Sequence, residues 1–368
     1  MTTSAVPAQS RAAETVGGRA TGAPAVPRDA FFDNAKLLAT VLVVLGHTWG
    51  PLVDNDPGMR GLRTCYLLVY SFHMPLFIMI SGWFSRSFAE NASDPGRLRR
   101  LLTSTVVPYV LFATAYQIYD KYRHDEPISV DLTVPFYLTW FLAALFVWRL
   151  SAPLWRTLRA PVLVATLVML GAGFASFSGE LDLGRVFQLL PFFVLGLTVR
   201  REHVQWVRNS RALRWAATPV FAAAFAAWYH YGPRVESAWL YRQSGHQQLG
   251  VGMAHWVVAA LGLALGALIL SLGFLALVPR RTNWFTSLGA GTQYTYLLHG
   301  FAVQMALAYD YEHSRFINSP TGLIALSAIA VLATGVLASP PVRRVLGWAV
   351  EPTMRWAFRS DRRPHRAA

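Results

Sequence analysis

The sequence predicts an all-α integral membrane protein, a bundle of about ten transmembrane helices with both termini in the cytoplasm. Hydrophobic residues make up 54% of the 368 residues and charged residues only 14%, which is too few to cover a water-soluble fold. Long apolar runs alternate with short charged segments along the chain. The runs lack the period-two alternation of a membrane β-barrel, so we expect helices and a multi-pass protein, most simply of a bacterial cytoplasmic membrane.

Ten apolar runs approach the ~20 helical residues that cross a hydrocarbon core of ~30 Å. The predicted spans cover residues 34–53, 65–84, 101–119, 134–155, 160–177, 183–200, 213–230, 250–278, 285–307 and 321–340. Residues 1–28 are rich in Ala, Thr, Ser, Gly and Pro, which is typical of a disordered tail. We therefore expect a cytoplasmic tail over 1–28, one membrane domain over 29–342 and a basic cytoplasmic tail over 343–368.

The distribution of Lys and Arg predicts the orientation. With the N-terminus inside, the predicted inner segments hold twenty-four basic residues and the outer loops seven, as the positive-inside rule requires. The net charge of +14 is spread over short clusters between apolar runs, which indicates contact with membrane lipids and argues against a nucleic-acid partner. A single cysteine, Cys65, excludes a disulfide framework and a cysteine metal site, and the span centres lack the carboxylates that a metal site needs, so no metal is expected.

Three histidines fall inside predicted spans, where an ionisable group is costly unless it is paired or faces water. They are His47, His73 and His299, and all three are candidate catalytic residues. The alternative for each is a hydrogen bond between helices. Lys36 precedes His47 by eleven residues, so both project from nearly the same helix face, ~16 Å apart along the axis. This places a cation at the inner rim below an imidazole near the middle of the membrane.

Further polar residues mark other faces of the bundle. In the ninth span Tyr296 and His299 belong to a polar stripe at helical spacing, and in the sixth span Arg185 and Gln188 are three residues apart. Trp140 begins the apolar part of the fourth span. We expect Tyr296, Trp140, Arg185 and Gln188 to contact an acceptor or an oxyanion.

Basic residues at the inner rim are candidates for holding phosphate groups. Arg97 and Arg100 share a helix face at the mouth of the third span, and Arg86 closes the second span. The alternative is that these arginines only determine topology.

The order of several motifs resembles the membrane acyltransferase-three family, especially its fucose 4-O-acetylase-like branch. The motifs are "FFDNAKLLATVLVVLGH", "FHMPLFIMISGWF", "RLRRLL" followed by "PYVLF", "TWFLAALFVW", "LPFFVLG" and "YLLHG". The resemblance covers about residues 34–307. It implies an integral-membrane enzyme that moves an acyl group, usually acetyl, from cytosolic acyl-CoA to a hydroxyl of a sugar or similar acceptor.

Carried over by motif, the resemblance makes His47 the essential histidine, preceded by Lys36 where many relatives have Arg, and associates Arg97 and Arg100 with the donor. We expect His47 to act as general base, with acetyl-CoA or another acyl-CoA as co-substrate and a carbohydrate or other hydroxyl compound as acceptor. An acyl-histidine intermediate stays open. A glycan or lipid-linked sugar transporter is the alternative function, although no inverted repeat is visible, and a non-catalytic scaffold is a third.

Overall fold

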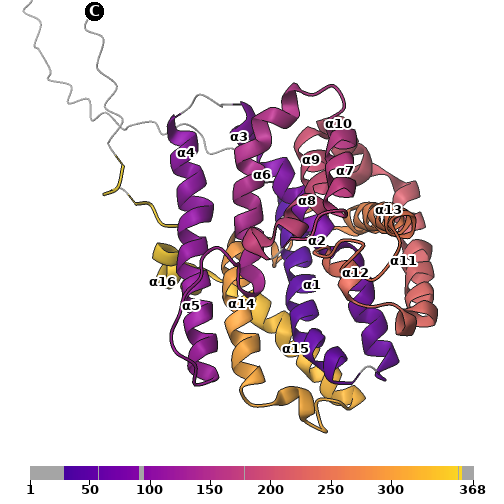
Figure 1. Cartoon of the computed structure of the whole chain (residues 1–368), viewed down its shortest axis with the longest axis vertical. Helices are drawn as coiled ribbons and strands as arrows, with labels where there is room; N and C mark the ends of the chain where they lie inside the picture. The colour runs from indigo at the N-terminus through magenta and orange to yellow at the C-terminus, as the bar shows by residue number, and fades with distance from the viewer. Residues whose placement is uncertain (1–28, 57, 91–94, 178, 355, 359–368) are drawn as a thin grey trace, which may run out of the picture.

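A computed structural model describes residues 29–56, 58–90, 95–177, 179–354 and 356–358 as a bundle of helices (Figure 1). The α-helices are α1 (Ala30–Asn55), α2 (Arg60–Phe84), α3 (Arg86–Glu90), α4 (Pro95–Leu101), α5 (Val107–Arg123), α6 (Trp140–Thr157), α7 (Pro161–Ala172), α8 (Leu183–Gln188), α9 (Leu190–Thr198), α10 (Arg201–Asn209), α11 (Arg211–Tyr231), α12 (Ala238–Tyr241), α13 (Met253–Leu277), α14 (Thr292–Leu307), α15 (Pro320–Leu337) and α16 (Pro340–Val350). The shorter turns are the π-helix η1 (Leu102–Val106) and the 3-10 helices η2 (Tyr137–Thr139), η3 (Glu180–Asp182), η4 (Gly232–Arg234), η5 (Thr286–Gly291) and η6 (Tyr311–His313). The described residues contain no strand.

Helices occupy all ten predicted places, but they differ in length and apolarity. Among the described residues, six segments are long and apolar enough to cross a membrane: Ala30–Asn55, Arg60–Phe84, Gly96–Arg123, Tyr137–Thr157, Met253–Leu277 and Pro320–Leu337. The sixth predicted span is bent by 59° between α8 and α9, and counts as a seventh crossing if the pair is one span. The other three predicted spans fall on α7 with 12 residues, α14 with 16, and α11, which is long enough but less apolar. The structure therefore supports a multi-pass protein of six or seven clear crossings, and ten stays a prediction.

Helix α1 is central because it packs against α2, α14 and α15 (Figure 1). It begins at Ala30 because the side chain of Asp29 accepts a hydrogen bond from the amide of Phe31 at 3.0 Å, which caps the helix. Pro51 lies inside α1, four residues after His47, and therefore cannot donate to the His47 carbonyl. Pro75 interrupts α2 in the same way, two residues after His73. Both histidine-bearing helices are thus weakened next to their histidine.

Helices α13 and α15 form much of the lipid-facing surface. Only 28% of the most apolar window of α13, and 17% of that of α15, is buried inside the protein. Apolar helices that expose most of their surface are stable when that surface contacts lipid. The predicted tail from residue 343 onward begins inside α16, which packs against α14, α15 and α5. The predicted tail over 1–28 lies outside the described residues.

Helices α2 and α9 approach each other closely because each places a glycine against the backbone of the other. A Cβ atom added to Gly196 would overlap the carbonyl oxygen of Met79, and one added to Gly82 would overlap the carbonyl oxygen of Phe193. Small residues at such contacts let membrane helices pack backbone against backbone. This contact fixes the half of α2 that follows His73.

We expect Gly196→Val to destabilise the bundle by roughly 1–3 kcal/mol or more, because the added methyl groups force α9 away from α2. The measurement is the thermal midpoint of the purified protein in detergent. Gly262→Val on α13 is the matched control, because a Cβ atom at Gly262 meets no described atom within 4 Å. Equal midpoints for the two variants would contradict this account of the α2–α9 contact.

Candidate active site

His47 on α1 and His299 on α14 lie against each other. Their ring centroids are 5.2 Å apart. His299 is buried and His47 is half-buried. The contact joins the first and the ninth predicted spans, which are about 250 residues apart in sequence. Sequence spacing identified each histidine separately, and the fold pairs them.

The hydrogen bonds of two histidines define their neutral tautomers. Nδ1 of His73 lies 2.8 Å from the carbonyl oxygen of Val69, and Nδ1 of His299 lies 3.0 Å from that of Thr295. A carbonyl oxygen only accepts, so Nδ1 carries the hydrogen in each ring. The neutral rings then have a lone pair on Nε2, and that of His299 is buried with no hydrogen-bond partner among the described residues. In this form both rings accept hydrogen bonds through Nε2. Such a ring is suited to orienting a group that donates a hydrogen bond more than to stabilising an oxyanion, because an oxyanion itself only accepts.

The tautomer of His47 is not fixed by a hydrogen bond in this way. Within the described part of the chain its ring makes no hydrogen bond, so both nitrogens are available. The ring of Tyr137 packs edge-on against it with centroids 5.1 Å apart. Tyr137 has a φ of 55°, in the left-handed region that a bulky residue rarely adopts. The bend at the start of η2 thus directs an aromatic ring toward His47, and no sequence pattern had indicated Tyr137.

A cavity of about 630 Å³ lies beside His47 and His73, and we call it the outer cavity. Its volume falls in the range of ligand sites. Aromatic and hydrogen-bonding side chains dominate its wall, including Asp54, Tyr66, Tyr70, Trp140, Arg185, Tyr241 and Gln243. The ring of Tyr70 packs edge-on against that of His73 with centroids 4.8 Å apart, and the hydroxyls of Tyr66 and Tyr241 are 2.8 Å apart. Aromatic faces beside hydroxyl, amide and carboxylate groups are suited to a polar, ring-containing ligand.

Of the four predicted acceptor residues, Arg185 and Trp140 line this cavity and Gln188 supports it. Tyr296 lines the other cavity described below, so the prediction that it contacts the acceptor is not supported by its position. Arg185 lines the cavity, forms an ion pair of 2.6 Å with Asp182, and lies 5.0 Å from the ring of Trp140, which also lines it. The Gln188 amide instead donates to the carbonyl of Ser244 at 3.0 Å, which holds the loop after α12. In the described part of the chain Gln188 is a support, not a wall residue.

Arg242 anchors the same loop. Its side chain is buried, and Nη1 donates to the carbonyl of Ala260 at 3.4 Å. Burial lowers the pKa of Arg242 to about 10, so it stays charged at neutral pH. Because Arg242 is fixed in this way, its neighbours Tyr241 and Gln243 face the outer cavity.

A second cavity, of about 250 Å³, lies at the other end of the same helices, and we call it the inner cavity. Lys36 and Arg149 line it together with Ser81, Ser104 and Tyr296. Nζ of Lys36 is 2.8 Å from a carboxylate oxygen of Asp33, three residues earlier on the same helix. Lys36 and His47 therefore belong to one helix but to two cavities.

Arg149 is the cation that sequence analysis passed over, although an arginine within an apolar span was a signal. Its guanidinium donates to the hydroxyls of Ser85 at 3.3 Å and Ser104 at 3.0 Å and lies over the ring of Phe88. No carboxylate pairs with it among the described residues. An arginine without a counter-ion at the wall of a cavity suits an anionic ligand.

The arginines predicted to hold phosphate lie elsewhere on this face. Arg97 donates to the carbonyls of Arg149 at 3.2 Å and Leu150 at 3.3 Å, which fastens α4 to the helix that carries Arg149. Arg86 donates to the carbonyl of Val199 and stacks on Trp83 at 3.7 Å. Arg100 is exposed on α4. Among the described residues, none of these three lines the inner cavity.

An aromatic partition, made of Phe77, Phe141 and Tyr296, separates the two cavities. The ring centroids of Phe141 and Tyr296 are 5.4 Å apart, and those of Phe77 and Tyr296 are 6.2 Å apart. All three line the inner cavity, and Tyr296 also contacts His299 at 6.1 Å. The Tyr296 hydroxyl donates to the carbonyl of Leu138, so its hydrogen is already used. In this structure no described residue lines both cavities.

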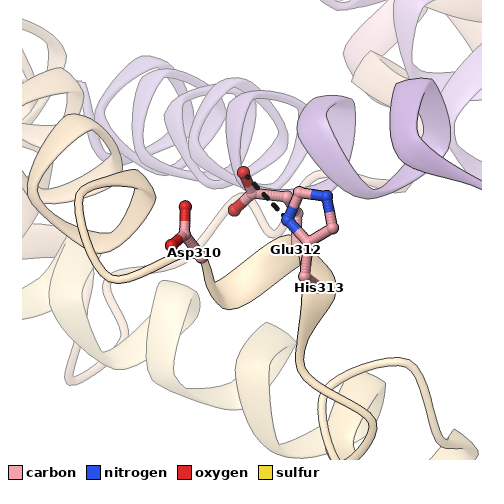
Figure 2. A group of neighbouring side chains, drawn as sticks. All are labelled: Asp310, Glu312 and His313. Atoms are coloured by element: carbon pink, nitrogen blue, oxygen red, sulfur yellow. Dashed lines mark ion pairs between the residues drawn. The ribbon is translucent and has the colours of Figure 1, made fainter. Parts of the chain in front are cut away.

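Asp310, Glu312 and His313 form a group whose ligand atoms lie close enough to hold a metal ion (Figure 2). Nδ1 of His313 is 3.7 Å from Glu312. The group follows α14 at the surface, and in the described structure none of the three residues lines the outer or the inner cavity. The prediction that the reaction needs no metal stays a prediction.

Comparison with known sequences identifies the class of protein. The profile of the acyltransferase-3 family, whose description is "Acyltransferase domain", matches residues 29–339. The match includes all three histidines and the described wall residues of both cavities except Glu351. Nodulation protein NolL of Mesorhizobium japonicum is 34% identical over 73 residues, 18% of this chain and 20% of that protein. The chain thus matches only a fifth of the length of that relative. No solved structure matches the chain.

The match over most of the chain favours an enzyme over the transporter and scaffold alternatives. The apolar helices agree with this family because its members work within a membrane. The chain belongs to the acyltransferase-3 family and is a multi-pass membrane acyltransferase.

Proposed function

We propose that this protein is an O-acetyltransferase of the fucose 4-O-acetylase-like branch, which moves acetyl from acetyl-CoA to a hydroxyl of a sugar, a cell-surface glycan or a secreted metabolite. The observation that carries the proposal is the contact of an uncommitted His47 with His299 beside the outer cavity. With both termini in the cytoplasm, the inner cavity receives the donor and the outer cavity holds the acceptor.

His47 acts as general base in this mechanism. The bare Nε2 of His299 lies beside the His47 ring, with the two ring centroids 5.2 Å apart, so a rotation of the His47 ring lets its N–H donate to His299 during the reaction. The other nitrogen of His47 then takes the proton of the acceptor hydroxyl. The hydroxyl oxygen bonds to the thioester carbonyl carbon, and the carbon–sulfur bond breaks. The CoA thiolate takes the proton from His47 as it leaves, so His47 returns to its neutral form.

The donor approaches from the cytoplasmic side. Lys36 and Arg149 supply positive charge at the inner cavity, and Arg97 holds the helix that carries Arg149. The thioester reaches His47 only when the aromatic partition opens, because Tyr296 and its two neighbours fill the space below His299. The closed partition keeps water in the outer cavity away from an incoming thioester.

The test is acetyl transfer by the purified protein in nanodiscs. Acetyl-CoA labelled in the acetyl group is supplied with a panel of fucosides, other glycosides and cell-wall oligosaccharides, and mass spectrometry detects the gain of one acetyl unit. We expect labelled ester on at least one carbohydrate hydroxyl. Transfer from no acyl-CoA to any member of the panel would overturn the proposal.

Asp54 offers a test of the acceptor site. We expect Asp54→Asn to raise the KM for the acceptor by about 10-fold, because a carboxylate that accepts hydrogen bonds from sugar hydroxyls becomes a neutral amide. The KM for acetyl-CoA stays unchanged. Asp56→Asn is the matched control, since Asp56 lies two residues away and, in the described structure, outside the cavity wall. A change in donor KM alone would remove Asp54 from the acceptor site.

A further inference from the structure

A third cavity, of about 500 Å³, lies between α14 and α16, and we call it the α16 cavity. Its wall includes Tyr294, Arg343, Arg344, Trp348 and Glu351. Glu351 also lines the inner cavity, so the two cavities meet at this residue. The family match ends at residue 339, so α16 (Pro340–Val350) lies outside the matched residues.

The inner cavity is too small for a whole coenzyme A molecule. Its volume of about 250 Å³ falls below the ~300–1,000 Å³ of typical ligand sites. It accommodates the narrow pantetheine arm, while the bulky phosphorylated nucleotide must stay outside. The α16 cavity adjoins the inner cavity, because Glu351 belongs to the walls of both.

The side chains of the α16 cavity match the chemistry of a phosphorylated nucleotide. Arg343 and Arg344 both line the cavity, and Nε of Arg343 is buried without a hydrogen-bond partner among the described residues. Guanidinium groups bind phosphate oxygens through paired hydrogen bonds. The indole of Trp348 is 69% exposed, an open aromatic face for a base to stack on.

Among the described residues of the cavity wall, Glu351 is the one carboxylate, and its position favours one orientation of the nucleotide and pantetheine parts of the ligand. Glu351 accepts a hydrogen bond from the Tyr294 hydroxyl at 3.3 Å and lies at the junction with the inner cavity. A carboxylate at that point repels phosphate and accepts hydrogen bonds from the amide N–H groups of pantetheine. Phosphates are therefore directed to the arginine end and pantetheine to the junction.

We propose that the α16 cavity binds the phosphorylated nucleotide end of the acyl-CoA donor. The inference rests on the proposed use of acyl-CoA. A phospholipid headgroup offers the same phosphate chemistry to Arg343 and Arg344, so the experiment includes an arm that separates the two sources of phosphate.

The experiment measures binding of CoA and of pantetheine, which lacks the nucleotide, to the full chain in phosphatidylcholine nanodiscs by titration calorimetry. The variants are Arg343→Gln with Arg344→Gln, and Trp348→Ala. The matched control is Arg201→Gln with Arg211→Gln, which removes the same charge from exposed positions of the predicted inner face. We expect the double α16 variant to bind CoA at least about tenfold more weakly and pantetheine unchanged, with the control like the wild type. Arg343→Lys with Arg344→Lys restores part of the affinity, because lysine returns the positive charge but not the paired N–H donors of the guanidinium.

Three results would overturn the inference, and each differs from failure of the proposed function. Unchanged CoA affinity in the double variant, while the wild type binds CoA, removes the nucleotide site and leaves the donor assignment. Equal losses for CoA and pantetheine mean that α16 only supports the fold. In nanodiscs containing phosphatidylglycerol, a fall in the CoA affinity of the wild type, with the double variant equal to the wild type in phosphatidylcholine, assigns the arginines to a lipid headgroup. A wild type that binds no CoA contradicts the proposed donor itself.

Discussion

Replacing His47 with Gln lowers kcat for acetyl transfer by roughly 10²–10⁴-fold, the contribution expected of a positioned general base. Glutamine keeps the polarity and most of the volume of the imidazole but accepts no proton at neutral pH. The KM for acetyl-CoA changes little, because the cations of the inner cavity belong to other residues. The measurement is initial rates with labelled acetyl-CoA at matched amounts of folded protein.

His255→Gln is the matched control for His47→Gln. His255 is an exposed histidine at the start of α13 that packs near Trp239, and in the described structure it lines neither the outer nor the inner cavity. Its variant keeps the wild-type rate. If His47→Gln also turned over within a few-fold of the wild type, His47 would be neither base nor nucleophile, and the proposed mechanism would be wrong.

Replacing Arg149 with Gln raises the KM for acetyl-CoA by about 10–100-fold, because a cation without a counter-ion disappears from the inner cavity. The two serine hydroxyls that it contacts can still pair with the glutamine amide, so the fold is retained. The KM for the acceptor stays near the wild-type value. Initial rates at varied acetyl-CoA and saturating acceptor give the comparison.

Arg156→Gln is the control for Arg149→Gln on the same helix. Arg156 lies two turns further along α6 and pairs with Glu90 at 2.8 Å at the surface, where an ion pair contributes little. Its variant retains the wild-type donor KM. A rise in acceptor KM with no rise in donor KM in Arg149→Gln would place the donor somewhere other than the inner cavity.

The arginines show how much of the site can be predicted from the local sequence. Arg97 and Arg100 stood out because they share a helix face at a span end, yet the guanidinium of Arg97 caps carbonyls of α6. Arg149 had only its place within an apolar span to mark it, and it lines the inner cavity. Periodicity places a residue on a face of its own helix, but the neighbour of that face depends on packing. For the same reason Tyr137 was missed, since its left-handed backbone conformation follows from the fold around it.

The sequence by itself determined that the chain is helical and crosses a membrane several times, and it identified the helices that carry His47, His73 and His299. These are local properties, because bilayer thickness sets the length of a span and the cost of burying an ionisable group applies to each residue separately. Only the tertiary structure decided that His47 meets His299, that Lys36 and His47 open onto different cavities, and that an aromatic partition lies between them. The physical reason is that contacts between distant spans are selected by side-chain packing, as at Gly82 and Gly196, and no regularity within one span encodes which span it will contact.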